Sequence, residues 1–185
     1  MSDIGEVQRA MGGDHDAYAA LVGAASRRLY ALACLILRDS DRAEDATQEA
    51  FVRAWREIPR LREAGRFDAW LRRLVVNACY DEGRHVKRRA EVSLLHASER
   101  FTADTASAMA ETDRVERAFR QLPLDQRAVL VLQHYIQLSH SEMADTLGIP
   151  IGTVKSRLHR ALGEMRTSVE TDPTPASPVP GGQVA

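Results

Sequence analysis

Apolar residues recur every three or four positions over most of the chain, as on the buried face of an amphipathic α-helix. Strand signals are nearly absent, because the sequence has no alternating Val, Ile and Thr runs and no Asn-Gly or Asp-Gly hairpin turns. The pattern therefore predicts an all-α fold.

The apolar period and its breaks predict three helices in the first half of the chain. The first covers residues 16–39. The second begins at residue 40, with Asp41 and Glu44 as an acidic capping pair, and ends at Pro59. The third covers residues 67–83 and ends in the basic stretch RHVKRR.

The second half begins with a change of composition. Residues 91–111 are mostly Ser, Thr, Ala and acidic residues with weak periodicity, which is typical of a linker. Helices resume at Thr112, at Pro123 and in the stretch SEMADTLGIPIGTVKSRLHRAL, whereas the Pro- and Gly-rich tail cannot bury a core. We expect two small helical domains joined by a flexible linker, and a disordered tail; their ranges are 1–90, 91–111 (the linker), 112–170 and 171–185 (the tail).

Composition and charge exclude several classes of protein. The chain has 185 residues, of which 44% are hydrophobic and 28% charged, as in a soluble globular protein, and its net charge of -1 does not point to nucleic acid. The N-terminus lacks a basic segment followed by an apolar run, and no window of about 18 uncharged apolar residues occurs. We therefore expect a cytoplasmic protein without membrane insertion.

Catalytic and metal-binding patterns are also missing from the sequence. Cys34 and Cys79 lie in apolar stretches and are interpreted as core thiols, and the spacing of His134 and His140 fits no usual metal site. No Gly-rich phosphate loop or nucleophile motif occurs. We expect no metal, no cofactor and no enzymatic activity.

The stretch from residue 141 to 162 has the spacing of a helix-turn-helix. Ala144 is the small residue where the helices cross, Gly148 suits the turn, and Val154 anchors the second helix. Basic and polar residues fill the exposed side of that second helix, which favours an interaction with the DNA major groove. A plain helical hairpin with a solvated basic face is the alternative.

The predicted helix that begins at residue 40 is also unusual, in its segment AEDATQEAFVRAW. Its small and aromatic apolar residues form one stripe, and its opposite side carries Asp45, Gln48, Glu49 and Val52. An ordinary solvated face would explain those polar residues. However, a basic segment at residues 60–89 follows an acidic cluster that consists of Asp39, Asp41, Glu44, Asp45 and Glu49. One domain therefore carries two surfaces of opposite sign: the acidic one suits a basic protein, and the basic one suits nucleic acid.

The segments AEDATQEAFVRAW, FDAWLRRLVVNACYDEGRHVKRR and LPLDQRAVLVLQHYIQLSHSEMADTLGIPIGTVKSRLHRAL resemble regions 2 and 4 of bacterial sigma factors of the extracytoplasmic-function (ECF) group. The resemblance extends from Tyr18 to Met165. It implies a dissociable initiation subunit that binds the β′ clamp coiled coil and the β flap of core RNA polymerase. It also implies recognition of promoter DNA at the -35 and -10 elements, and control by an anti-sigma protein.

The resemblance also implies site residues. The positions matched to polymerase binding are Asp45, Gln48, Glu49 and Val52. The positions matched to the -10 element are Arg73, Asn77, Tyr80, Asp81, Arg84, Lys87 and Arg88. The positions matched to the -35 element are Thr153, Lys155, Ser156, Arg157, His159 and Arg160. Phe51, Trp55 and Trp70 are expected to support these surfaces from the core.

The sequence departs from the family pattern at Glu82 and Gly83, which predicts that the -10 helix ends early. Residues 61–66 correspond to the loop that captures a flipped base in the family, but they are generic here. There is no room for a region 3 domain, and no inhibitory extension is expected before Asp14. The remaining alternative is a helix-turn-helix regulator that binds operator DNA by itself.

Overall fold

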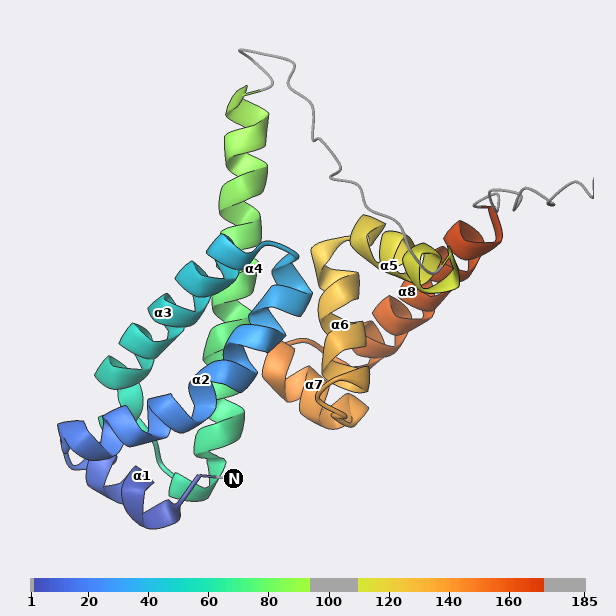
Figure 1. The fold of residues 1–185 in the computed structure, drawn as a ribbon. Coiled ribbons are helices and arrows are strands. Elements are labelled where there is room, and N and C mark those ends of the chain that lie inside the picture. Colours follow the sequence, from blue (N-terminus) through green and yellow to red (C-terminus); the bar gives the residue numbers. More distant parts are fainter. Residues whose placement is uncertain (1, 94–109, 172–185) are drawn as a thin grey trace, which may run out of the picture.

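The computed structural model describes residues 2–93 and 110–171, and these residues form two helical bundles (Figure 1). Within them there is no strand, which confirms the all-α prediction. The N-terminal bundle consists of α1 (Ile4–Met11), α2 (His15–Leu37), α3 (Ser40–Glu57) and α4 (Phe67–Ser93). The C-terminal bundle consists of α5 (Ala110–Gln121), α6 (Leu124–His134), α7 (His140–Leu147) and α8 (Ile151–Thr171). The tail predicted to be disordered lies outside the described residues, apart from its first residue.

Side-chain caps set where α2 and α3 begin. The Asp14 carboxylate accepts hydrogen bonds from the backbone N–H groups of Asp16 and Ala17, both at 3.0 Å. The predicted capping pair of α3 is wrong: Asp39 is the cap, and it accepts from the Arg42 N–H at 3.1 Å. Pro59 ends α3 as predicted, in a single 3-10 turn at Ile58–Arg60.

Two helix boundaries differ further from the sequence prediction. Helix α1 was not predicted, and it buries Val7 and Ala10 against the rest of the bundle. The early end expected for α4 is wrong, because this helix continues through Gly83 to Ser93. A glycine inside a helix costs only about 0.5–1 kcal/mol relative to alanine, which is too little to end a helix whose neighbouring turns are stable.

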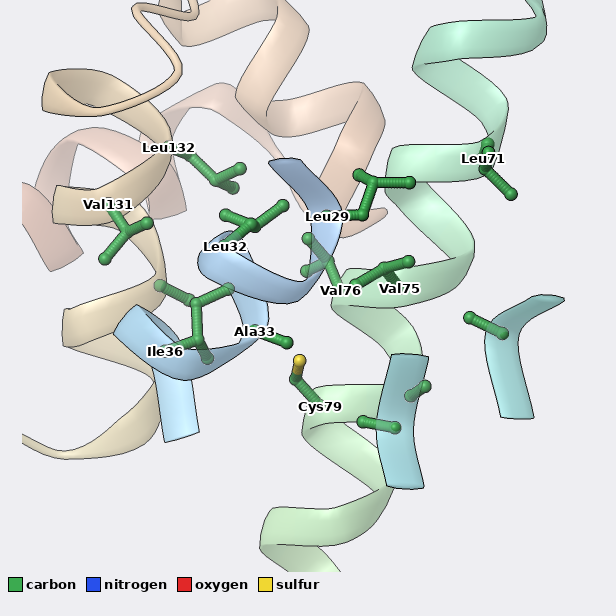
Figure 2. Close-up of a cluster of buried hydrophobic side chains, with 14 of the residues drawn as sticks. Leu29, Leu32, Ala33, Ile36, Leu71, Val75, Val76, Cys79, Val131 and Leu132 are labelled. Atoms are coloured by element: carbon green, nitrogen blue, oxygen red, sulfur yellow. The ribbon is translucent and has the colours of Figure 1, made fainter. Parts of the chain in front are cut away.

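One continuous apolar core joins the two bundles. Leu32 and Ile36 of α2 face Val131 and Leu132 of α6, as Figure 2 shows. Leu32, Ile36 and Leu132 are fully buried there.

Helix α2 is long and apolar enough to cross a membrane by length and composition alone. Its buried face packs inside the protein core, as in the central helix of a globular protein. We therefore regard it as a core helix, and nothing places it in a membrane.

Helices α7 and α8 form the predicted helix-turn-helix. Ser139 and Glu142 cap α7 reciprocally, with the Glu142 carboxylate accepting from the Ser139 N–H at 2.8 Å. The Ser139 hydroxyl also donates to this carboxylate, and the hydrogen bonds from the hydroxyl and from the backbone N–H lower the pKa of Glu142. Gly148 ends α7 in the left-handed region at φ 66°, which confirms the predicted turn. Met143, Val154 and Leu158 fill the contact between the two helices.

Candidate functional site

The outward face of α3 carries the residues predicted to bind polymerase. Asp45, Gln48 and Glu49 are exposed, and Val52 is an exposed apolar residue with 44% of its surface accessible. The opposite face of α3 buries a row of small side chains: Ala43, Ala46, Ala50 and Ala54. These alanines bring α3 close to α4, so the outward face has a rigid base.

Aromatic residues hold α3 from its other side. The ring of Trp55 lies 4.4 Å from that of His15 and 4.9 Å from that of Tyr18, measured between centroids. The Tyr18 hydroxyl donates a hydrogen bond to the Phe51 carbonyl oxygen at 2.5 Å. Phe51 and Trp55 are both half-buried, so they pack in supporting positions as expected.

A groove of about 560 Å³ runs between α3 and α4 beside these residues. Its walls include Asp45 and Glu49 from α3 and Glu82 and His85 from α4. Sequence reasoning did not place Glu82 and His85 in this site. The signal was available, because Ala78, Glu82 and His85 recur at helical spacing and share one face of α4.

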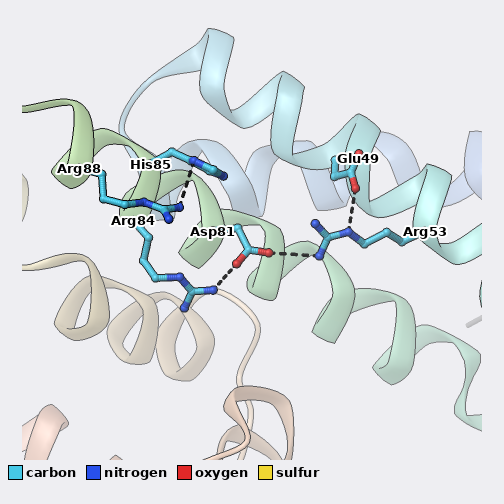
Figure 3. A network of polar contacts seen from close by, with 6 residues as sticks. All are labelled: Glu49, Arg53, Asp81, Arg84, His85 and Arg88. Carbon is cyan, nitrogen blue, oxygen red and sulfur yellow. Dashed lines mark hydrogen bonds and ion pairs between the residues drawn. The ribbon is translucent and has the colours of Figure 1, made fainter. Parts of the chain in front are cut away.

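Ion pairs tie the two walls of the groove together (Figure 3). Arg53 donates to Glu49 at 2.8 Å and to Asp81 at 3.1 Å, and Asp81 also pairs with Arg84. The Asp81 carboxylate therefore joins α3 to α4 in this conformation. Arg88 contacts the His85 ring and is exposed, whereas the side chain of Lys87 lies outside the described residues.

On another side of α4, Arg73 and Tyr80 lie near the C-terminal bundle, Arg73 beside Gly148 and Tyr80 beside Arg157 of α8. Arg73 and Arg84 are exposed, and Asn77 is half-buried. The Tyr80 hydroxyl is fully buried and has no hydrogen-bond partner of normal geometry. Burial raises the pKa of Tyr80 to about 12, although the nearby Arg157 of α8 favours the charged form.

Helix α8 presents the residues predicted to read the -35 element. Lys155, Ser156, His159 and Arg160 are exposed on one side, and Thr153 is half-buried in the first turn. Arg157 points elsewhere: it pairs with Asp125 of α6 at 3.3 Å and lies near Tyr80. The structure thus separates Arg157 from the other basic residues of this helix.

Neither cysteine forms a disulfide in the part of the chain that the structure describes. Cys34 and Cys79 are free, and burial raises the pKa of Cys79 to about 12, so its thiol stays protonated. No group of His, Cys, Asp and Glu residues in the described ranges could hold a metal ion.

Comparison with protein families decides what these surfaces belong to. Residues 21–90 match the Sigma-70 region 2 family, and residues 112–165 match Sigma-70, region 4. The ECF RNA polymerase sigma factor SigW of Bacillus subtilis is 32% identical over 167 residues, which cover 83% of this chain and 89% of SigW. SigM of Mycobacterium tuberculosis is 36% identical over 166 residues, which cover 85% of this chain and 83% of SigM. The chain belongs to the ECF group of RNA polymerase sigma factors.

Two solved structures share this fold. CnrH, determined in complex with the cytosolic domain of CnrY, is 25% identical with a TM-score of 0.66, and the match covers 94% of this chain and 100% of that one. The fold also matches the sigma factor RpoE of Bartonella quintana, determined with the anti-sigma factor NepR, at 24% identity and a TM-score of 0.65, over 84% of this chain and 98% of that one.

Membership of the ECF group makes this protein a transcription initiation factor, which acts with core RNA polymerase at promoter DNA. Two matched regions in the expected order favour this function over an autonomous operator-binding regulator.

Proposed function

We propose that the exposed face of α3 docks this sigma factor on the β′ clamp coiled coil of core RNA polymerase. Asp45 and Glu49 would pair with basic residues of the clamp, Gln48 would hydrogen-bond, and Val52 would supply apolar contact. The observation that carries the proposal is that these four side chains are exposed on one stripe of a helix whose other side is anchored by buried alanines. Glu82 and His85 extend the same surface across the groove.

We assign promoter recognition to the two remaining polar surfaces. Lys155, Ser156, His159 and Arg160 would enter the major groove of the -35 element, with Thr153 at the start of the helix. On α4, a surface that includes Arg73, Asn77, Tyr80, Arg84, Lys87 and Arg88 would hold the separated -10 strand. Asp81 contributes by fixing Arg84, and Arg157 by fixing α8 on α6.

An apolar groove of about 440 Å³ is the surface that we propose for the β flap. It lies between α5, α6 and α8, with Leu35 of α2 at one wall, and it includes the exposed side chains Tyr135 and Leu162. We also propose control by an anti-sigma protein, the partner that membership of the ECF group implies. The proposed location is the cytoplasm, where polymerase and promoter DNA occur together.

Binding to bacterial core RNA polymerase tests the docking face. The wild-type chain should bind tightly at moderate salt, and Asp45→Arg/Glu49→Arg should weaken binding by about tenfold or more, because like charges that face each other across an interface cost several kcal/mol. The matched control is Glu57→Arg/Glu63→Arg, which reverses two exposed acidic residues of the same bundle away from the docking face. It should bind as the wild type does.

Two results would contradict the assignment. Equal weakening by both double variants would mean that only net charge matters. If the wild type binds duplex DNA tightly without polymerase and does not bind polymerase, the autonomous regulator is the better description.

A further inference from the structure

The C-terminal bundle covers part of the α4 face that we assign to -10 DNA. Tyr80 lies against Arg157 of α8 and Asp125 of α6, and its hydroxyl is fully buried. The guanidinium of Arg73 lies at the helix-turn-helix, since a Cβ added to Gly148 would be 3.6 Å from its Nη2 atom. Both residues are thus held against the bundle that should read the other promoter element.

The absence of a side chain at Gly83 makes this packing fit. A Cβ added to Gly83 would lie 2.6 Å from Cδ1 of Leu124, which is closer than real Cβ contacts. Leu124, the first residue of α6, therefore occupies the space that a side chain at residue 83 would take. This explains why a helix-weakening residue stands in the middle of α4.

Polar contacts also join the bundles. Arg38, at the end of α2, forms an ion pair with Glu116 of α5 and lies 5.9 Å from the centre of the Phe119 ring. Arg72 of α4 faces Glu142 and Asp145 of α7 across a shared pocket. Together with the apolar contact between α2 and α6, the ion pair of Arg38 with Glu116 holds the two bundles against each other (Figure 2).

The other two functional surfaces stay open in the same arrangement. Asp45 and Glu49 are exposed on α3, and Lys155 and Arg160 are exposed on α8. The buried Tyr80 hydroxyl, by contrast, lacks the hydrogen bond that buried polar groups nearly always have. Removal of the C-terminal bundle would open this hydroxyl to a hydrogen-bond partner outside the chain.

We propose that this chain closes on itself, with the C-terminal bundle masking its own -10 surface through the contact of Leu124 with Gly83. The closed form leaves the polymerase-docking face and most of the -35 face accessible, so polymerase can engage the chain before the -10 surface is uncovered. The conformational part of this inference rests on geometry alone, and its consequence for DNA rests on the proposed role of Asn77 and Tyr80.

The test is to wedge the contact open in the full chain. Gly83→Leu places a bulky side chain against Leu124 and replaces glycine by a good helix former, so α4 itself should stay intact. Gly23→Leu is the matched control, because Gly23 is exposed in α2 and a Cβ there meets nothing within 4 Å. Gly83→Leu/Leu124→Ala removes the opposing side chain and should restore closure.

Two measurements report on the variants. Small-angle X-ray scattering should give a larger radius of gyration for Gly83→Leu than for the wild type, the control or the double variant. A fluorescent random-sequence single-stranded DNA should bind Gly83→Leu about tenfold or more tightly than the wild type, because the apparent affinity scales with the open fraction. Adding Asn77→Ala to Gly83→Leu should abolish that gain.

Three results would overturn the proposal. An extended wild type, or a radius of gyration that Gly83→Leu leaves unchanged, means that the contact does not hold the chain closed. Opening without tighter DNA binding means that the contact masks nothing. In that last case, promoter opening by polymerase carrying Asn77→Ala separates the causes: impaired opening leaves the -10 assignment standing, and normal opening removes it as well.

Discussion

The turn at Gly148 offers a sharp test of how this fold positions its DNA-reading helix. Its backbone has φ 66° and ψ 34°, in the left-handed region that residues with a Cβ avoid. We expect Gly148→Val to destabilise the protein strongly, Gly148→Ala less, and Gly148→Asn least, because asparagine tolerates this conformation best.

The magnitude follows from the surroundings of the turn. A Cβ at Gly148 would lie 3.6 Å from the nearest other atom, Nη2 of Arg73, which is an ordinary contact, so steric overlap adds little. A residue with a Cβ in the left-handed region costs about 1–2 kcal/mol, and a β-branched residue is at the upper end or beyond. Replacing glycine also lowers the conformational entropy of the unfolded chain, which stabilises the folded state by about 0.4–1 kcal/mol. The net loss for valine should be about 1–2 kcal/mol, which lowers the Tm by about 2–8 °C in a chain of this size.

Urea and thermal unfolding followed by circular dichroism measure this loss. Gly152→Val is the matched control, since Gly152 lies in the first turn of α8 and an added Cβ meets nothing within 4 Å. The control should be neutral or stabilising. Equal stabilities for Gly148→Val and Gly152→Val, or an asparagine variant as unstable as the valine variant, would refute the conformational argument.

Three further changes test other parts of the structure. Arg160→Ala should relax base preference at one -35 position and cost about 1–3 kcal/mol in promoter binding by the holoenzyme. Arg157→Ala loses the ion pair with Asp125, so it should lower the stability of the protein and leave the base preference unchanged. An equal loss of base preference in both variants would contradict the separation of their roles. Ser139→Ala should lower the unfolding free energy at neutral pH, and the difference from wild type should shrink on acidification. The reason is that the pKa of Glu142 is lower in the folded protein than in the unfolded chain. The stabilisation by the ionised Glu142 is therefore present above the unfolded pKa and is lost as the pH falls through the folded pKa. A pH-independent difference in urea unfolding would show that the capping box is not its source. Arg53→Ala should cost no more than about 1 kcal/mol in urea unfolding, because its pairs with Glu49 and Asp81 are largely solvated, and a much larger loss would mean that the network is shielded from water.

Local patterns predicted most of the helices and one of the surfaces. The period of apolar residues located α2, α3 and the helix-turn-helix, because burial of one face is encoded within a few turns of sequence. The same logic placed Lys155 and Arg160 on the exposed side of α8. It failed at α4, since propensity treats Gly83 as a break, whereas the helix continues and uses the missing side chain to accept Leu124.

The sequence by itself determined the all-α class, the turn at Gly148 and the stripe of Asp45, Glu49 and Val52, all of which depend on residues within a few positions of one another. It also determined the family, because two sets of motifs occur along the chain in the expected order. Only the tertiary structure decided that Asp81 pairs with Arg53, that Glu82 lines the groove with Asp45, and that Tyr80 is buried beside Arg157. Those contacts join residues from separate helices, and their geometry depends on how the helices and bundles pack. The spacing of residues within a single helix does not determine which side chains of other helices lie opposite them.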